Sequence, residues 1–199
     1  MYQRSFSLLS SENSLLFVVD IQERLMPVIN KGDTVIFNTR RLLNSAQLLE
    51  IPVLVSEQYP KGLGATAAEI VPAIPKTTPV IAKKSFSVCA VEEIQRELEK
   101  YPVSKIILCG VETHVCILQS AFDFLAMGKE VVLIVDAVGS RFSIDNEIAI
   151  RRLESSGVTL ATAESVIFEW CGTSEHPQFK TISRIAKEKA GNSKQNTGI

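Results

Sequence analysis

The segment from Lys105 to Arg141 constrains the fold more than any other part of the chain. A short apolar run at 106–109 is followed by a helical pattern from about Thr113 to Gly128 and by a second apolar run at 131–135. This order of strand, helix and strand predicts a βαβ unit and therefore a parallel sheet. The apolar face expected for the helix is made of Val115, Leu118, Phe122 and Leu125.

Cys116 lies about one turn into that helix, just beyond the end of a buried strand. Open α/β sheets usually place their chemistry at this edge, and a helix start favours a thiolate over a thiol. The alternative is that Cys116 packs in the core, because free cysteines are among the most buried residue types. Position alone does not decide between these interpretations.

Length and composition restrict the class of protein. The 199 residues fit one ordinary domain, which we expect over 1–189, followed by a disordered tail at 190–199. The formal net charge of −1 does not suggest a nucleic-acid or membrane surface. The sequence contains no run of eighteen apolar residues, so no transmembrane helix is expected. The polar residues at 10–13 argue against a signal peptide.

The four cysteines and two histidines are widely spaced. Without a CxxC pattern, reduced thiols and a cytoplasmic protein are the default expectation. Neither His114 nor His176 has the spacing of a metal ligand, so no metal site is expected. Cys89, Cys109 and Cys171 are interpreted as packing residues.

Strand and helix patterns alternate along the whole chain. The expected strands are 14–20, 53–57, 80–82, 106–109, 131–135 and 158–162; the main expected helices are 33–50, 91–100, 113–128, 144–156, 165–171 and one from His176 to about Lys187. Residues 136–141 are expected to join a strand to a loop. Six strands alternating with helices predict an α/β fold with three layers, in which helices cover both faces of a doubly wound parallel sheet.

Three polar groups follow three of these strands. Asp20 ends the first strand, Lys83 and Lys84 end the third, and Cys116 follows the fourth. Because successive side chains on an extended segment point in opposite directions, at most one of the two lysines can enter a cleft. If the three strands are neighbours, an acid, a base and a thiol converge at one edge of the sheet.

The loop at 58–64 contains two glycines but lacks the spacing of a phosphate-binding loop. We interpret it as a surface loop or the rim of a pocket. Gln58, Tyr59 and Phe86 are candidate pocket-lining residues, although aromatic residues at strand ends also serve packing. His114 is two residues from Cys116, a spacing that places the two side chains on different sides of a helix and argues against a papain-like Cys–His pair.

Three motifs resemble those of the isochorismatase-like cysteine hydrolase superfamily. They are FVVDIQ with Asp20, AKKSFS with Lys83, and GVETHVC with Cys116. The similarity extends from about residue 13 to 185. The stretches EQYPKGLG, HPQFK and VCIL are most similar to the isochorismatase domain-containing proteins, a branch that has been labelled "mar1 ribonuclease".

The resemblance implies a six-stranded sheet of order 3-2-1-4-5-6 and a catalytic triad. Cys116 would be the nucleophile, Asp20 its proton acceptor, and Lys83 the residue that holds the pair and stabilises the thiolate. The backbone N–H groups of Glu112 and Cys116 would form an oxyanion hole, with a cis peptide between Val111 and Glu112. The family also implies a homodimer or homotetramer.

The expected function is therefore hydrolysis of a C–N bond in a small amide, imide or carbamoyl compound, through a thioester on Cys116. No cofactor is expected, and the absence of histidine in the segment after the second strand argues against a metal-assisted nicotinamidase. The presence of Cys116 argues against the vinyl-ether hydrolysis of family members that lack the cysteine. The alternative is a catalytically silent relative that acts as a binding or scaffold protein. A ribonuclease is disfavoured, because the chain is not basic and offers no pair of histidines for acid–base catalysis.

Overall fold

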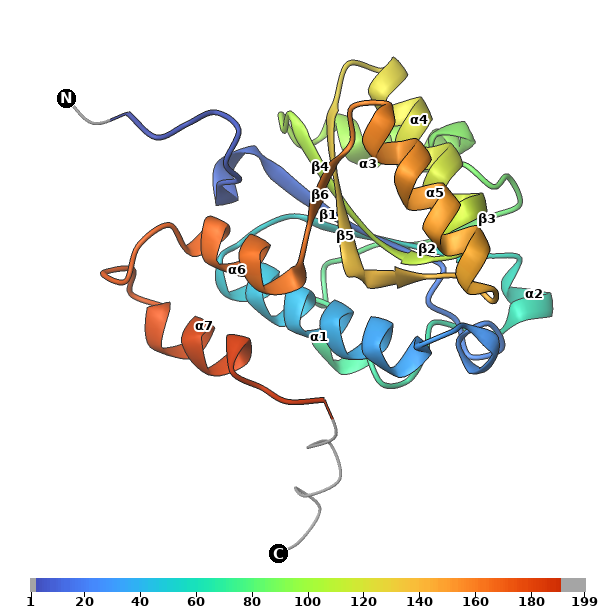
Figure 1. The fold of residues 1–199 in the computed structure, drawn as a ribbon, viewed down its shortest axis with the longest axis horizontal. Helices are drawn as coiled ribbons and strands as arrows, with labels where there is room; N and C mark the ends of the chain where they lie inside the picture. Colours follow the sequence, from blue (N-terminus) through green and yellow to red (C-terminus); the bar gives the residue numbers. More distant parts are fainter. Residues whose placement is uncertain (1–2, 191–199) are drawn as a thin grey trace, which may run out of the picture.

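The computed structural model describes residues 3–190 and has one parallel sheet at its centre (Figure 1). The strand order is β3-β2-β1-β4-β5-β6, as the resemblance implied. The strands are β1 (Ser14–Val19), β2 (Val53–Gln58), β3 (Val80–Lys83), β4 (Lys105–Val111), β5 (Glu130–Gly139) and β6 (Thr159–Ala161). The tail expected at 190–199 lies outside the described residues except for Ala190. The expectation of one domain over 1–189 stays a prediction.

Helices cover both faces of the sheet, which confirms the three-layer prediction. The helices are α1 (Gly32–Leu48), α2 (Pro60–Leu63), α3 (Glu92–Glu99), α4 (Leu118–Ala126), α5 (Ser143–Ser155), α6 (Ala163–Cys171) and α7 (Phe179–Ala186). Helices α1, α6 and α7 cover one face, and α3, α4 and α5 cover the other (Figure 1). Among the described residues, no helix is both long and apolar enough to cross a membrane.

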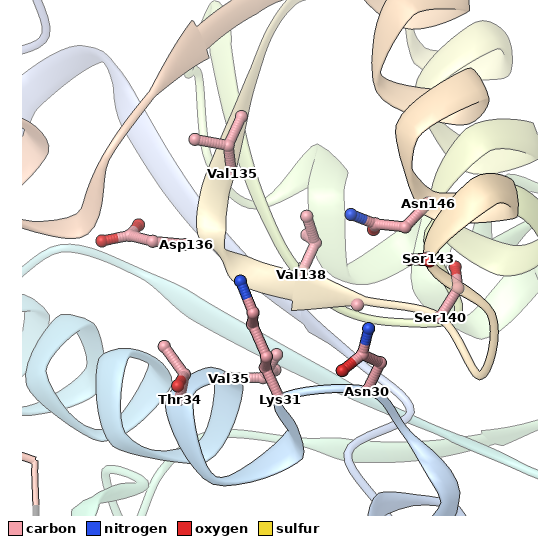
Figure 2. A pocket seen from close by; sticks show the side chains of 11 residues that line it. Asn30, Lys31, Thr34, Val35, Val135, Asp136, Val138, Ser140, Ser143 and Asn146 are labelled. Atoms are coloured by element: carbon pink, nitrogen blue, oxygen red, sulfur yellow. The ribbon is translucent and has the colours of Figure 1, made fainter.

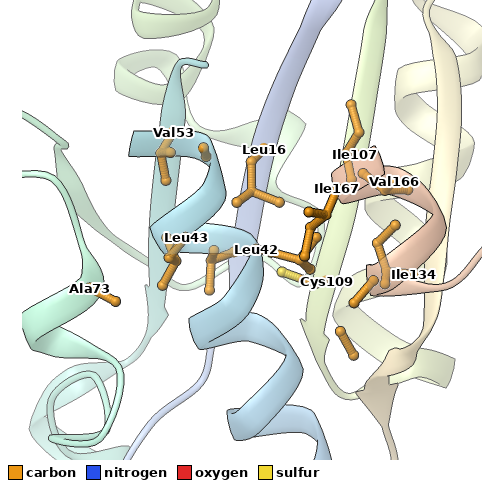
Figure 3. Close-up of a cluster of buried hydrophobic side chains, with 14 of the residues drawn as sticks. Leu16, Leu42, Leu43, Val53, Ala73, Ile107, Cys109, Ile134, Val166 and Ile167 are labelled. Carbon is orange, nitrogen blue, oxygen red and sulfur yellow. The ribbon is translucent and has the colours of Figure 1, made fainter. Parts of the chain in front are cut away.

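Two hydrophobic cores, one on each face, hold the layers together. On the first face, Leu42 of α1 and Ile167 of α6 pack over strand residues such as Leu16 and Ile107 (Figure 3). The second core includes Phe17 and Phe124, whose ring centroids are 6.2 Å apart. The central strands β1 and β4 are buried along their whole length, as expected for strands covered on both sides.

Strand β5 is longer than the sequence suggested. The segment 136–141 was expected to leave the sheet, but β5 continues to Gly139. The pairing with β4 is interrupted, so that Leu108 pairs with Leu133 whereas Gly110 pairs with Val138. The extra residues of β5 bulge out of the sheet between these two pairs. The apolar run at 131–135 ends at this bulge, so the pattern of apolar residues places the end of β5 too early.

The helix after β4 also differs from the expectation. Its first turn, Thr113–Ile117, is π-helical, and the regular helix α4 begins at Leu118. The wider turn rotates the following residues relative to an ideal helix. As a result Ala121 and Phe124 are fully buried, whereas Phe122 and Leu125 of the expected face are only partly buried.

Gly110 of β4 pairs with Val19 of β1 and leaves no space for a side chain. Its φ is +120°, and a Cβ atom there would overlap the backbone of Val19. Gly110→Ala should lower the free energy of unfolding by about 3 kcal/mol or more, because backbone strain and overlap add. Gly128→Ala, at φ +75° with open space around it, should cost only about 1 kcal/mol. Urea denaturation of both variants measures the difference, and equal losses would contradict the close-approach argument.

Candidate functional site

Asp20 begins the site directly after β1. Its backbone is left-handed, with φ 54°, and its side chain is completely buried. Ser56 of β2 donates its hydroxyl to Asp20 Oδ1 at 2.8 Å, and Asp20 Oδ2 lies 2.6 Å from Lys83 Nζ. A buried carboxylate requires such partners, because an isolated charge in the interior is very costly. The turn after β1 therefore fixes this carboxylate in one orientation.

Lys83 enters the interior from the end of β3. Its side chain is buried, whereas that of Lys84 is exposed, as strand alternation requires. Besides Asp20, the ammonium group contacts Gln58 Oε1 at 2.7 Å and the backbone oxygen of Phe86 at 3.1 Å. These oxygen acceptors compensate for the lost hydration of the ammonium group. Lys83 is thus held at the meeting point of the polar groups.

Cys116 lies in the π-helical turn and is almost completely buried. Its Sγ atom is 3.5 Å from Lys83 Nζ. Burial raises the pKa of the Cys116 thiol to about 12; the charge of Asp20 and a hydrogen bond to it act in the same direction, and Lys83 opposes them. The sequence-based expectation of a lowered pKa is therefore wrong for this structure. Desolvation of a thiolate outweighs the single favourable lysine.

The three residues meet although their strands are not all neighbours. From the residues alone, the convergence depended on the condition that β1, β3 and β4 are neighbours. This condition is met for β1 and β4, whereas β2 lies between β1 and β3. Lys83 spans this gap with its long side chain. Strand β2 fills the gap with Ser56 and Gln58, which contact Asp20 and Lys83 respectively. The ends of β1 and β3 and the turn after β4 therefore bring an acid, a base and a thiol together, and β2 supplies hydrogen-bond partners for the acid and the base.

Gln22 anchors the loop after β2 and was not identified from the sequence. It is fully buried, and its side-chain amide donates to the backbone oxygens of Gln58 and Gly64 and accepts from the backbone N–H of Gln58. Tyr59 and Phe86 are each about half exposed, so they do not serve core packing. Of the three candidate pocket-lining residues, Gln58 alone contacts a polar group of the site through its side chain. A buried glutamine inside a loop leaves no periodic signal that would reveal it.

The turn that contains Cys116 is tied to the connection between β5 and α5. The backbone N–H and Nε of Arg141 donate to Glu112 Oε2 at 2.9 and 3.2 Å, and Thr113 Oγ1 donates to Asn146 Oδ1 at 2.6 Å. The peptide between Val111 and Glu112 is cis. His114 Nδ1 is 3.0 Å from Ser140 Oγ, so its ring faces the same connection and not Cys116.

A cavity of about 290 Å³ lies behind this connection (Figure 2). Ser140 and Asn146 line it on one side, and the ammonium group of Lys31 projects into its middle. Neither Cys116 nor Asp20 lines this cavity. Within residues 3–190, no group of three or more His, Cys, Asp or Glu side chains could hold a metal ion.

The remaining cysteines are buried in the two cores: Cys109 and Cys171 on one face of the sheet, Cys89 on the other. Cys109 Sγ lies 3.8 Å from the backbone oxygen of Phe17, within the sheet. Burial raises the pKa of Cys89 and of Cys109 to about 12. These thiols have no lysine and no carboxylate in contact with the sulfur, which distinguishes them from Cys116.

Residues 14–165 match the model of the isochorismatase domain family. The chain belongs to this family. It is 40% identical to the isochorismatase domain-containing protein 2A of Mus musculus, over 89% of this chain and 84% of the relative. It is 42% identical to the isochorismatase domain-containing protein 1 of Danio rerio, over 92% of this chain but only 64% of that longer relative.

A solved structure from the same family group has the same fold. It is described as the MAR1 ribonuclease from Caenorhabditis elegans, with 37% identity and a TM-score of 0.88 over 94% of this chain and 96% of that one. The isochorismatase-like hydrolase fold and the family resemblance are thereby confirmed. These similarities do not assign roles to individual residues. Such roles have to be argued from the geometry described above.

The buried ion pair makes a testable prediction about stability. Lys83→Met leaves the carboxylate of Asp20 buried without its cation, which should lower the free energy of unfolding by about 3–5 kcal/mol. Lys84→Met, at the exposed neighbour, should change it by less than about 0.5 kcal/mol. Adding Asp20→Asn to Lys83→Met should restore part of the loss. Urea denaturation tests this, and similar stabilities for the two lysine variants would contradict the burial of the pair.

The raised thiol pKa makes a testable prediction about reactivity. Because the reactive thiolate forms only near pH 12, the rate of Cys116 alkylation by iodoacetamide should rise about tenfold per pH unit up to pH 10, without a plateau. Asp20→Asn removes a negative charge and should lower the thiol pKa. Peptide mass spectrometry measures the rate at Cys116 separately from the other cysteines. A plateau below pH 9 in the native chain would disprove the raised pKa.

Proposed function

We propose that this protein is a cysteine-dependent hydrolase that cleaves a C–N bond in a small amide, imide or carbamoyl compound. One observation supports this most directly: Lys83 Nζ contacts both Asp20 and Cys116 Sγ, and all three residues are buried. A structural ion pair does not need a thiol beside it, whereas a nucleophile needs a base and a cation. The proposal therefore assigns the triad Asp20, Lys83 and Cys116.

The raised pKa determines how the reaction would begin. The resting thiol is neutral, so attack must be coupled to the loss of its proton. Cys116 Sγ attacks the substrate carbonyl carbon while Asp20 accepts the proton, and Lys83 compensates the negative charge that passes between them. The tetrahedral intermediate then expels the nitrogen group, which takes the proton from Asp20. A thioester remains on Cys116.

Water completes the reaction. Asp20, again a carboxylate, accepts a proton from a water molecule that attacks the thioester carbonyl. The C–S bond breaks, the acid is released, and the thiolate takes back the proton. In both halves negative charge develops on the carbonyl oxygen, which the backbone N–H groups of Glu112 and Cys116 would stabilise, as the family resemblance implies. Losing one such donor typically costs about a hundred- to a thousand-fold in rate.

Access limits the substrate to small compounds. Only 6% of Cys116 is exposed, so a substrate must place its carbonyl group into a narrow opening. The half-exposed rings of Tyr59 and Phe86, on the segments that flank Lys83, would contact the rest of a small planar molecule. The chain has a net charge of −1 and offers no basic composition for RNA, although a similar structure is described as a ribonuclease. We therefore expect a small-molecule substrate without a nucleic acid, membrane, metal or cofactor requirement.

The alternative proposal is a catalytically silent family member that binds a partner. The complete Asp–Lys–Cys contact favours the enzyme, because a binding protein has no need to keep a buried ion pair against a thiol. A cytoplasmic homodimer or homotetramer stays part of the proposal.

A screen of small amides, imides, ureas and carbamoyl compounds for ammonia or amine release tests the function. Cys116→Ser, Asp20→Asn and Lys83→Met should each lower kcat by about 10³-fold or more, since the three groups act as a unit. Lys84→Met is the matched control and should keep full activity. Rapid quenching and mass spectrometry should detect an acyl group on Cys116. Full turnover by Cys116→Ser would refute the mechanism, and a native protein inactive on every compound class would favour the silent alternative.

A further inference from the structure

The turn at 112–117 is held from one side by a separate element of the fold. Four of its polar contacts go to the segment 140–146, which joins β5 to α5 and forms the first turn of that helix. These two segments are about thirty residues apart in sequence. The same turn contains Cys116 and the backbone N–H groups that the proposed function assigns to the oxyanion hole.

Arg141 fixes the side chain of Glu112. Both its backbone N–H and its guanidinium Nε donate to the same carboxylate oxygen, Oε2. The Glu112 side chain is 10% exposed, whereas that of Arg141 is 53% exposed. A nearly buried carboxylate with two donors from one residue cannot rotate freely without losing both hydrogen bonds. The carboxylate is joined to the Glu112 backbone by two methylene groups, so fixing it limits how far this backbone can move from the segment 140–146.

Asn146 fixes the next residue. Thr113 is fully buried, and its hydroxyl donates to Asn146 Oδ1 at 2.6 Å. Asn146 belongs to α5, a helix of 13 residues whose Ala149 and Leu153 are anchored in the hydrophobic core. The helix therefore acts as a rigid support for this side of the turn. Ser140 and Asn146 also line the cavity of about 290 Å³ (Figure 2). Because the side chains around this cavity leave it open, packing from that side cannot replace these hydrogen bonds.

We infer that Arg141 and Asn146 are positioning residues that aim the backbone N–H of Glu112 at the carbonyl oxygen of the substrate. Neither residue contacts Cys116, Asp20 or Lys83, so they act on the site only through the turn. This inference rests on the proposed function, because it concerns the same oxyanion hole. A purely structural role would stabilise the loop without any effect on a reaction that develops negative charge on oxygen.

Two thiol reagents distinguish these roles without knowledge of the natural substrate. When Cys116 adds to acrylamide, a C–S bond forms at the terminal carbon and the electron pair of the double bond moves onto the carbonyl oxygen. The proton lost by the thiol later returns to the neighbouring carbon. With iodoacetamide, the C–S bond forms as iodide leaves, and no oxyanion develops. Only the first reaction should benefit from aligned N–H donors.

The ratio of the two rate constants at Cys116, acrylamide over iodoacetamide, is the quantity to measure. Both reagents consume the same thiolate, so the thiol pKa cancels in the ratio. Peptide mass spectrometry on the full chain gives both rate constants, and glutathione supplies the ratio for a thiol without an oxyanion hole. We expect the native ratio to exceed that of glutathione by about tenfold or more.

Asn146→Ala should lower this ratio toward the glutathione value. Arg141→Ala removes the guanidinium donor but keeps the backbone N–H, so it should lower the ratio by a smaller amount. Thermal unfolding shows that the variants are folded. Asn146→Asp keeps an acceptor for the Thr113 hydroxyl and should restore the native ratio. Arg151→Ala is the matched control, because it breaks an exposed ion pair with Glu147 on the same helix and should leave the ratio unchanged.

Two results would overturn the inference, and they separate it from the proposed function. In the first, the native ratio is well above that of glutathione, and both Arg141→Ala and Asn146→Ala leave it unchanged. This result would show an oxyanion hole that these two residues do not position. A native ratio equal to that of glutathione would show no oxyanion hole at all, and then the inference and the oxyanion step of the proposed function fail together.

Discussion

The contact between Lys83 and Asp20 is the interaction on which the arrangement of the site depends. A carboxylate and an ammonium group buried at 2.6 Å tolerate little displacement, because the cost of leaving either charge unpaired is several kcal/mol. The pair joins the ends of β1 and β3, which are not adjacent, and forces β2 to place polar side chains between them. Ser56 and Gln58 therefore serve the ion pair, because each forms a hydrogen bond with one of its two members.

The same pair explains why the thiol stays protonated. Within residues 3–190, Lys83 is the cation that contacts Cys116, and its charge is largely matched by Asp20. Burial then dominates, and the pKa rises to about 12. A lysine beside a cysteine lowers the thiol pKa less when a carboxylate next to the same thiol already balances its charge. The spacing of residues along a chain does not show whether the charge of such a lysine is already balanced by a carboxylate.

Much of the fold followed from the sequence because buried parallel strands and helices have clear periodic patterns, as in β1 and in the βαβ unit around Cys116. The boundaries failed where local geometry departed from the ideal, at the bulge in β5 and the π-helical turn before α4. Asp20, Lys83 and Cys116 were identifiable because each follows a strand, and the resemblance selected Lys83 over Lys84. Gln22, Ser56 and Arg141 were not identified, because a hydrogen-bond partner across the sheet or in a loop leaves no local pattern.

A neutral thiol at Cys116 also changes how the protein tolerates oxidants. Burial raises the pKa of Cys116 to about 12, so very little of it is a thiolate at neutral pH. The thiolate, and not the thiol, attacks peroxides and disulfides, so oxidation of Cys116 to a sulfenic acid or a mixed disulfide should be slow. The burial that keeps the sulfur protonated thus also protects it from oxidants, and Cys116 would be a poor redox sensor.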